Sequence, residues 1–213
     1  MSFALRFILK EMRSSEVITL IIALIISVGT VTSISLFVDR LQLSFEQESA
    51  NLLAADRVVR SDEPIAKAWQ QHAKSLGLEQ AQRTSFATMI FANDKLQLSQ
   101  ISAVTQSYPL KGEFLVDDAL FAQGAPSSSA PAKGEIWLSS RLASLLDVTI
   151  GQSVEVGDTL LQVSKYLVID PGSSTSAFAV SPRAVMNASD LAATHVIIPG
   201  SRVRYSLLLA GQR

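Results

Sequence analysis

The side chains that could carry catalysis are few and widely separated in this chain of 213 residues. Its two histidines, His72 and His195, stand far apart, and it has no cysteine, so neither a metal site nor a thiol nucleophile is indicated. Adjacent acids occur at Asp62-Glu63 and Asp117-Asp118, but acids at the ends of segments usually act as solvated caps and do not transfer protons. We therefore expect no metal ion and no catalytic residue.

Sequence signatures of nucleotide binding and of serine hydrolases are not found either. The chain contains no P-loop, no G-x-G-x-x-G and no G-x-S-x-G. Ser173-Ser174 follows Pro171-Gly172, which is the composition of a loop and not of a nucleophile elbow. A membrane-anchored hydrolase is therefore the weakest of the functions considered. The sequence predicts a protein that is not an enzyme and has no cofactor of its own.

Charge excludes another class of function. There are 18 Lys and Arg residues against 19 Asp and Glu residues, the formal net charge is −1, and the basic residues form no cluster. A nucleic-acid-binding protein needs a basic patch or stripe to neutralise phosphates, so we expect no nucleic-acid partner.

Small residues inside a long apolar segment have the most informative spacing. Ala23 and Ser27, and likewise Gly29 and Ser33, are four residues apart, which is the spacing that lets two helix backbones approach closely in lipid. Ser and Thr in such a helix can instead bond to carbonyl groups of their own helix, and this alternative remains open. Our candidates for helix packing are Ala23, Ser27, Gly29 and Ser33.

The segment around these residues is long enough to cross a membrane. Residues 17–38 contain no charged residue and as a helix would rise about 33 Å, against roughly 30 Å for the hydrocarbon core of a bilayer. This run is longer than that of a secretory leader and leads into Asp39-Arg40, so we expect an uncleaved transmembrane helix over 17–38.

The flanks of the span predict its orientation. Three basic residues, Arg6, Lys10 and Arg13, precede it, and only Arg40 follows closely. The positive-inside rule then places the N-terminus in the cytoplasm and residues 39–213 in the periplasm of a bacterium, with the span in the inner membrane. Residues 1–16 form either a cytoplasmic amphipathic helix in the headgroup region or a plain basic flank.

The remaining chain predicts a stalk followed by one α+β domain. Residues 39–56 contain no Gly or Pro and continue the helical pattern, so we expect the membrane helix to extend as a stalk. In the domain, residues 57–213, the expected elements are a strand at 56–61, a helix at 63–77, two strands joined at Asn93-Asp94, a strand at 136–138, a helix from Ser139, strands 153–156 and 159–169 joined at Gly157-Asp158, a helix starting at Ser181-Pro182, and a final strand at 201–210. Residues 122–133 predict an exposed loop, which is either the boundary of two small lobes or an insertion site.

Several stretches resemble one family. The stretch 136–169, "IWLSSRLASLLDVTIGQSVEVGDTLLQVSKYLVI", resembles the recurring core of the periplasmic domain in FtsX/MacB-type ABC transporter permeases. Residues 85–114, "SFATMIFANDKLQLSQISAVTQSYPLKGEF", together with "ADRVVRS" and "PGSRVRY", are similar to the first periplasmic domain of the YbbP-type permeases of that superfamily. The resemblance covers essentially the whole chain.

The resemblance implies a function and partners. In that family the first span and periplasmic domain are followed by further spans, and a separate ATPase binds ATP. This chain would therefore be the N-terminal part of a permease subunit in an ATP-driven export or mechanotransmission complex for hydrophobic or lipid-like cargo, and it ends at Arg213, short of the family pattern. Its implied partners are an ABC-type ATPase subunit and further transmembrane helices or a second permease copy.

The resemblance also implies which regions make contacts. Leu41–Leu53 would form the stalk, and the regions of Trp69 or Tyr108-Pro109, expected to be exposed, would meet a partner or cargo. The alternative function is a self-sufficient single-span membrane protein with a periplasmic binding or scaffold domain.

Overall fold

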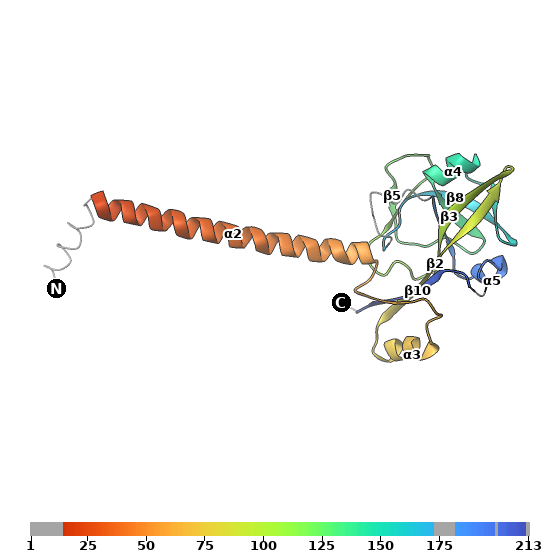
Figure 1. Ribbon diagram of the computed structural model, residues 1–213, viewed down its shortest axis with the longest axis horizontal. Coiled ribbons are helices and arrows are strands. Elements are labelled where there is room, and N and C mark those ends of the chain that lie inside the picture. Colours follow the sequence, from red (N-terminus) through yellow and green to blue (C-terminus); the bar gives the residue numbers. More distant parts are fainter. Residues whose placement is uncertain (1–14, 173–181, 199, 212–213) are drawn as a thin grey trace. The chain divides into compact units, whose positions relative to one another are not determined.

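The computed structural model describes residues 15–172, 182–198 and 200–211 (Figure 1). The chain divides into two compact units, Met1–Glu48 and Ser49–Arg213. Most of the expected cytoplasmic segment 1–16, and the pair Ser173-Ser174, lie outside the described residues.

Helix α2, Ser15–Leu53, runs without interruption through the apolar segment and the expected stalk. Its window Ile21–Val38 has a mean hydropathy of 2.4 and none of it is buried within the chain, so length and composition suit a membrane span. Residues 39–53 remain helical, as expected for a stalk, because they contain no residue that breaks a helix. The limits of the span at 17 and 38 stay a prediction.

The second unit is built on one mixed sheet. Its strand order is β1-β10-β2-β3-β9-β6-β8-β4-β5, and β7 pairs with both β2 and β8. The strands are β1 Arg57–Ser61, β2 Glu79–Ala92, β3 Lys95–Val104, β4 Phe114–Asp117, β5 Ala125–Ser127, β6 Glu135–Ser139, β7 Ser153–Val156, β8 Thr159–Ile169, β9 Arg183–Asn187 and β10 Val203–Ala210. The helices are α3 Lys67–Ser75, α4 Ser140–Leu146 and α5 Leu191–Thr194. The α+β prediction is confirmed.

Two expected turns are confirmed. Asn93 and Asp94 join β2 to β3 with φ angles of 49° and 57°, which short polar side chains tolerate better than other residues. Gly157, with φ 56°, opens the turn from β7 to β8, and a Cβ atom there would lie 1.9 Å from the carbonyl oxygen of Thr194. Glycine is therefore required at 157 both by its backbone angle and by the neighbouring chain.

The core consists of two hydrophobic clusters on opposite faces of this sheet. Phe86 and Ile90 of β2 point into the first cluster, together with α4, whereas Ala81 of the same strand points into the second. Adjacent residues of β6 divide in the same way, because Ile136 and Leu138 belong to the first cluster and Trp137 to the second. Successive side chains of a strand point to opposite faces, so the central strands are covered on both sides. The two small lobes of the prediction are not found, because each cluster contains residues from both sides of 122–133 and one sheet runs through the whole domain.

The helix expected from Ser181-Pro182 is wrong. Residues Arg183–Asn187 form strand β9, parallel to β3 and antiparallel to β6, and only Leu191–Thr194 are helical. Ala184, Val185 and Met186 are all buried, so this central strand lacks the alternation of apolar and polar residues that marks a half-exposed strand. A Ser-Pro start followed by apolar residues was compatible with a helix, but pairing with β3 and β6 makes this segment a strand. Ser181 lies outside the described residues.

The exposed loop expected at 122–133 is partly wrong, and no lobe boundary lies there. Ala125–Ser127 form the edge strand β5 against β4, and Ala130 is buried in the second cluster. The carbonyl oxygen of Pro131 accepts a hydrogen bond of 2.8 Å from Asn187 Nδ2. The segment is held by contacts with distant residues, which its small, Pro-broken composition did not indicate.

Candidate functional site

The four helix-packing candidates lie on α2 and are exposed within the chain. At about 100° per residue, the pair Ala23/Ser27 and the pair Gly29/Ser33 lie on different sides of the helix, about 120° apart. No atom would lie within 4 Å of a Cβ atom added at Gly29, so nothing in the described chain occupies that side. The helix thus offers two separate small-residue surfaces. Their use for helix packing stays a prediction.

Two threonines next to these pairs bond within the helix. Thr30 Oγ1 donates to the carbonyl oxygen of Ile26 at 2.7 Å, and Thr32 Oγ1 donates to that of Val28 at 2.8 Å. For these two residues the structure shows the local alternative, in which the hydroxyl group is satisfied by its own helix.

The chain enters the domain immediately after α2 through fully buried residues. Ala54 and Ala55 have no exposed surface, and the Ala54 carbonyl oxygen accepts hydrogen bonds of 3.0 Å from the backbone N–H groups of Leu110 and Lys111. Asp56 N–H then donates to the Leu209 carbonyl oxygen at 3.1 Å. The two residues Ala54 and Asp56, which follow the helix, are therefore fixed to the domain by main-chain hydrogen bonds.

The chain leaves the sheet beside the point where it enters. Strand β10 pairs antiparallel with β1, from Arg57 opposite Leu209 to Ser61 opposite Tyr205. The Gly211 N–H group donates to Asp56 Oδ2 at 3.1 Å, and Lys111 Nζ lies 3.4 Å from Asp56 Oδ1. Asp56 thus connects the incoming strand, the outgoing strand and the loop before β4.

A buried polar cluster lies near this junction. Arg83 of β2 forms an ion pair of 2.9 Å with Asp170, which follows β8, and its guanidinium also donates to Ser102 of β3. Arg83 Nη1 donates to the Tyr108 hydroxyl oxygen at 3.3 Å, and that hydroxyl group lies 3.0 Å from Asp170 Oδ1 and also contacts the Pro171 carbonyl oxygen. Three segments far apart in the sequence are joined by one hydrogen-bonded group.

The electrostatics of this cluster suit structure and not acid–base catalysis. Burial raises the pKa of the Tyr108 hydroxyl far above its usual value, and the neighbouring Asp170 raises it further. Burial also raises the pKa of Asp170, while the positive charge of Arg83 and the Tyr108 hydroxyl act in the opposite direction. Burial acts to lower the pKa of Arg83, but the Asp170 carboxylate and the Tyr108 hydroxyl together outweigh it, so the pKa is raised and Arg83 stays charged. The pair needs both charges to remain satisfied in the interior.

The residues expected to make contacts differ in exposure. Tyr108 is fully buried, so the expectation that it is exposed to a partner is wrong; its ring packs 5.5 Å from that of Phe114. Trp69 on α3 is 60% exposed, as expected. The Tyr108 hydroxyl is instead the group that completes the buried cluster with Arg83 and Asp170.

The candidate chemical residues do not converge in the described part of the chain. His72 is exposed on α3, and His195 Nδ1 lies 3.1 Å from Asp158 Oδ2 on the surface. Asp117 accepts a hydrogen bond from the Ala119 N–H group, as a cap does. Among residues 15–172, 182–198 and 200–211, no three His, Cys, Asp or Glu side chains are arranged to hold a metal ion.

Comparison with known families gives the broader assignment. Residues 17–210 match the family model of the MacB-like periplasmic core domain. The chain belongs to this family. The match begins inside α2 and ends at the last residue of β10, so it covers the helix and the whole sheet of this MacB-like chain.

A curated relative agrees with this. The MacB-like chain is 32% identical over 206 residues to the uncharacterized ABC transporter permease YbbP of Escherichia coli (strain K12). The alignment covers 97% of this chain and 25% of the relative, so the chain spans about a quarter of that protein's length. The predicted resemblance to ABC transporter permeases of the FtsX/MacB superfamily, YbbP type, is thereby confirmed. The apolar helix and the family together describe a membrane protein with a periplasmic domain.

A solved structure is also similar in part. A crystallised domain assigned to a permease protein of Porphyromonas gingivalis shares 14% sequence identity with the MacB-like chain, covers 71% of this chain and 73% of that domain, and superposes with a TM-score of 0.41. At that score the similarity adds nothing to the family assignment.

Proposed function

We propose that this chain is the N-terminal part of a permease subunit in an ATP-driven ABC export or mechanotransmission complex that handles hydrophobic or lipid-like cargo. Residues 39–213 lie in the periplasm and the N-terminus lies in the cytoplasm of a bacterial inner-membrane protein. ATP binds to a partner ATPase subunit, and this chain performs no catalysis. Further transmembrane helices or a second permease copy pack against α2.

The observation that carries this proposal is the continuity of α2 with the domain. The helix runs from Ser15 to Leu53 without a break and is followed at once by the buried Ala54 and Ala55. An uninterrupted helix is stiffer than a loop, so movement of the span would be passed to the sheet through main-chain hydrogen bonds at Ala54.

The orientation is tested first, and the absence of cysteine makes the test simple. Ser129, an exposed residue of the domain, and Ser2 are changed singly to cysteine, and intact cells are treated with a membrane-impermeant maleimide. We expect S129C to be labelled after permeabilisation of the outer membrane alone, and S2C only after lysis. The reverse pattern would overturn the orientation.

Transmission is tested by breaking the stalk. Gln47→Pro removes a helix hydrogen bond, which should destabilise α2 by about 3 kcal/mol or more and kink or break it there. The control Gln47→Ala keeps the helix. The reporter is the substitution Trp69→Cys in the full permease complex. We expect Q47P to abolish the ATP-dependent change in its maleimide reactivity and Q47A to preserve that change. A chain that functions unchanged after deletion of its ATPase would instead favour the self-sufficient scaffold.

A further inference from the structure

We propose that one face of the β2–β3 hairpin is a docking surface for a protein segment that presents apolar side chains together with a lysine or arginine. Two cross-strand pairs form it: Met89 opposite Leu98, and Phe91 opposite Leu96. Their residues are 44%, 56%, 38% and 62% exposed respectively, although all four are large and apolar. We call these four residues the hairpin face.

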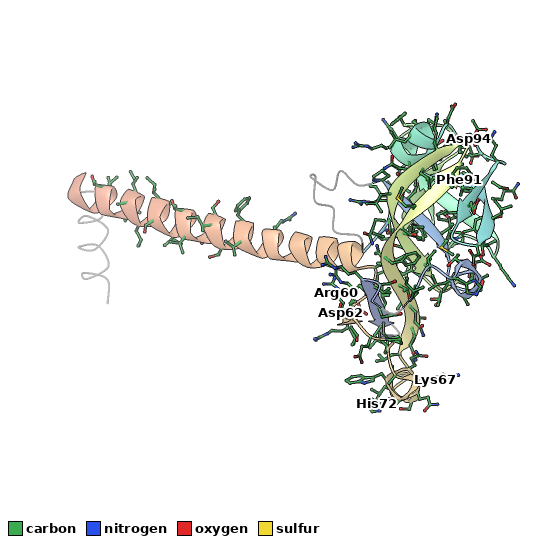
Figure 2. All side chains as sticks on the ribbon, turned by 45° about the vertical axis from the view of Figure 1, so that its right-hand side comes forward. Arg60, Asp62, Lys67, His72, Phe91 and Asp94 are labelled. Atoms are coloured by element: carbon green, nitrogen blue, oxygen red, sulfur yellow. The ribbon has the colours of Figure 1, made fainter. Side chains whose placement is uncertain are left out.

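The hairpin face lies on a side of the sheet that is buried along the first part of β2 and exposed at the hairpin. On β2, Ala81 and Arg83 point to the same side as Met89 and Phe91, and at that end of the strand this side is buried. The opposite side of the hairpin is covered, since Ile90 is fully buried. Figure 2 shows Phe91 and Asp94 at the end of the domain farthest from His72 of α3. Within the described residues, the second cluster does not extend to this end.

Neighbouring strands continue the apolar surface and add a negative charge. Phe91 pairs with Glu155 of β7, and Glu155 pairs in turn with Leu160 of β8, which is 70% exposed. Paired residues of antiparallel strands share a face, so the row from Leu96 through Phe91 and Glu155 to Leu160 is continuous. A carboxylate therefore stands between apolar side chains.

No basic side chain of the described hairpin neutralises that carboxylate. Lys95 pairs with the buried Ala92, so it points to the other side, where its ammonium lies 3.7 Å from Asp147. Asp94 lies in the turn beside the face and adds negative charge, whereas the carboxylate of Asp158 in the next turn is engaged by His195. The chemistry that complements this surface is apolar contact plus one cation.

Two other occupants fit less well. In a two-fold contact with a second copy, the same patch meets itself, which would bring Glu155 near Glu155 with no basic residue of the face between them. A bacterial membrane surface carries anionic lipids, which repel an acidic rim. The surface therefore favours a protein segment with Leu-like and Lys-like side chains.

The test uses a defined probe and the full chain in phosphatidylcholine nanodiscs. A labelled amphipathic helix of leucine and lysine is titrated and followed by fluorescence anisotropy, and a leucine–glutamate helix of the same length is the charge control; empty nanodiscs give the background. The variants are L96S/L98S, E155Q and E155K, all at exposed positions. The matched control is F121S, which removes an aromatic side chain that is 72% exposed and lies outside the hairpin.

We expect the leucine–lysine probe to bind wild type, to bind L96S/L98S at least about tenfold more weakly, as removal of a hot spot does, and to bind F121S unchanged. E155Q should weaken binding about two- to fivefold and E155K more, with the effect of E155Q reduced in salt. Equal binding by all variants, or equal binding of the leucine–glutamate probe, would overturn the proposal. So would self-association, or binding to phosphatidylglycerol vesicles, that is lost in L96S/L98S.

Discussion

Removing one partner of the buried pair Arg83–Asp170 should strongly destabilise the domain. The two side chains are 12% and 4% exposed, and their charged atoms are 2.9 Å apart. In Asp170→Asn, Arg83 keeps its neutral partners Ser102 and Tyr108 but loses its counter-charge. Breaking a buried pair in this way costs about 3–5 kcal/mol, because one charge stays desolvated without compensation.

That loss is large enough to measure reliably. For a domain of this size about 1 kcal/mol corresponds to roughly 2–4 °C, so D170N should lower the melting temperature by roughly 6–20 °C. In urea, with a slope of about 1–3 kcal/mol per molar, the midpoint should fall by about 1 M or more. Fluorescence of Trp137, which is buried in the second cluster, reports unfolding in a Trp69→Phe background.

The reciprocal variant should depend on pH. Arg83→Met removes the positive charge, and burial already raises the pKa of Asp170, so the carboxyl group can escape the penalty by taking up a proton. The folded-state pKa then lies above the unfolded value. The stability tied to this proton is fully present below the unfolded pKa and is lost as pH rises through the folded pKa. R83M should therefore lose less stability at pH 5 than at pH 8.

The double variant decides whether the two residues act as a pair. R83M/D170N should be more stable than the sum of the single effects predicts, by at least about 1 kcal/mol, since neither charge remains unpaired. The control is Asp118→Asn, whose carboxylate lies 3.6 Å from Lys165 on the surface and should matter by less than about 0.5 kcal/mol. Additive single effects, each below about 1 kcal/mol, would refute the reasoning.

Two further predictions concern packing and are read from urea unfolding. Gly157→Ala should cost more than about 3 kcal/mol, because its Cβ would meet the Thr194 carbonyl oxygen at 1.9 Å, whereas Gly77→Ala, at φ 71° with no atom within 4 Å of its Cβ, should cost only about 1 kcal/mol; equal losses would contradict this. Leu142→Ala on α4 should cost about 2–5 kcal/mol because Leu142 is fully buried, and Leu145→Ala, at a position 43% exposed, should cost clearly less; a reversed order would show that the packing of α4 is misassigned.

Local signals were sufficient for the hairpins. The dipeptide Asn93-Asp94 between two runs of β-forming residues, and Gly157-Asp158 between two others, predicted the turns that the structure contains. Both turns need backbone angles that few residues adopt easily, so the residue types at these positions are enough to predict the turns.

Long-range pairing could not be read in the same way. Strand β9 is buried on both faces between β3 and β6, so its sequence carries no period that separates a strand from a helix. Arg83 and Asp170 are 87 residues apart, and the sequence around either residue does not indicate the other as its partner. Arg83 lies on the same side of β2 as the buried Ala81. This was the single available sign that Arg83 needed a buried partner of opposite charge.

The second cluster links the two residues after α2 to the Arg83–Asp170 pair through Tyr108. Ala54 and Ala55 share this cluster with Tyr108, Phe114 and Trp137. The Phe114 ring lies 5.5 Å from that of Tyr108 and 5.1 Å from that of Trp137, the latter edge to face. Packed aromatic rings are rigid, and Tyr108 is fixed by the ion pair. If the domain is moved through α2, as proposed, displacement of Ala54 would reach the central strand β6 through these rings, and Phe114→Ala would weaken transmission as well as stability.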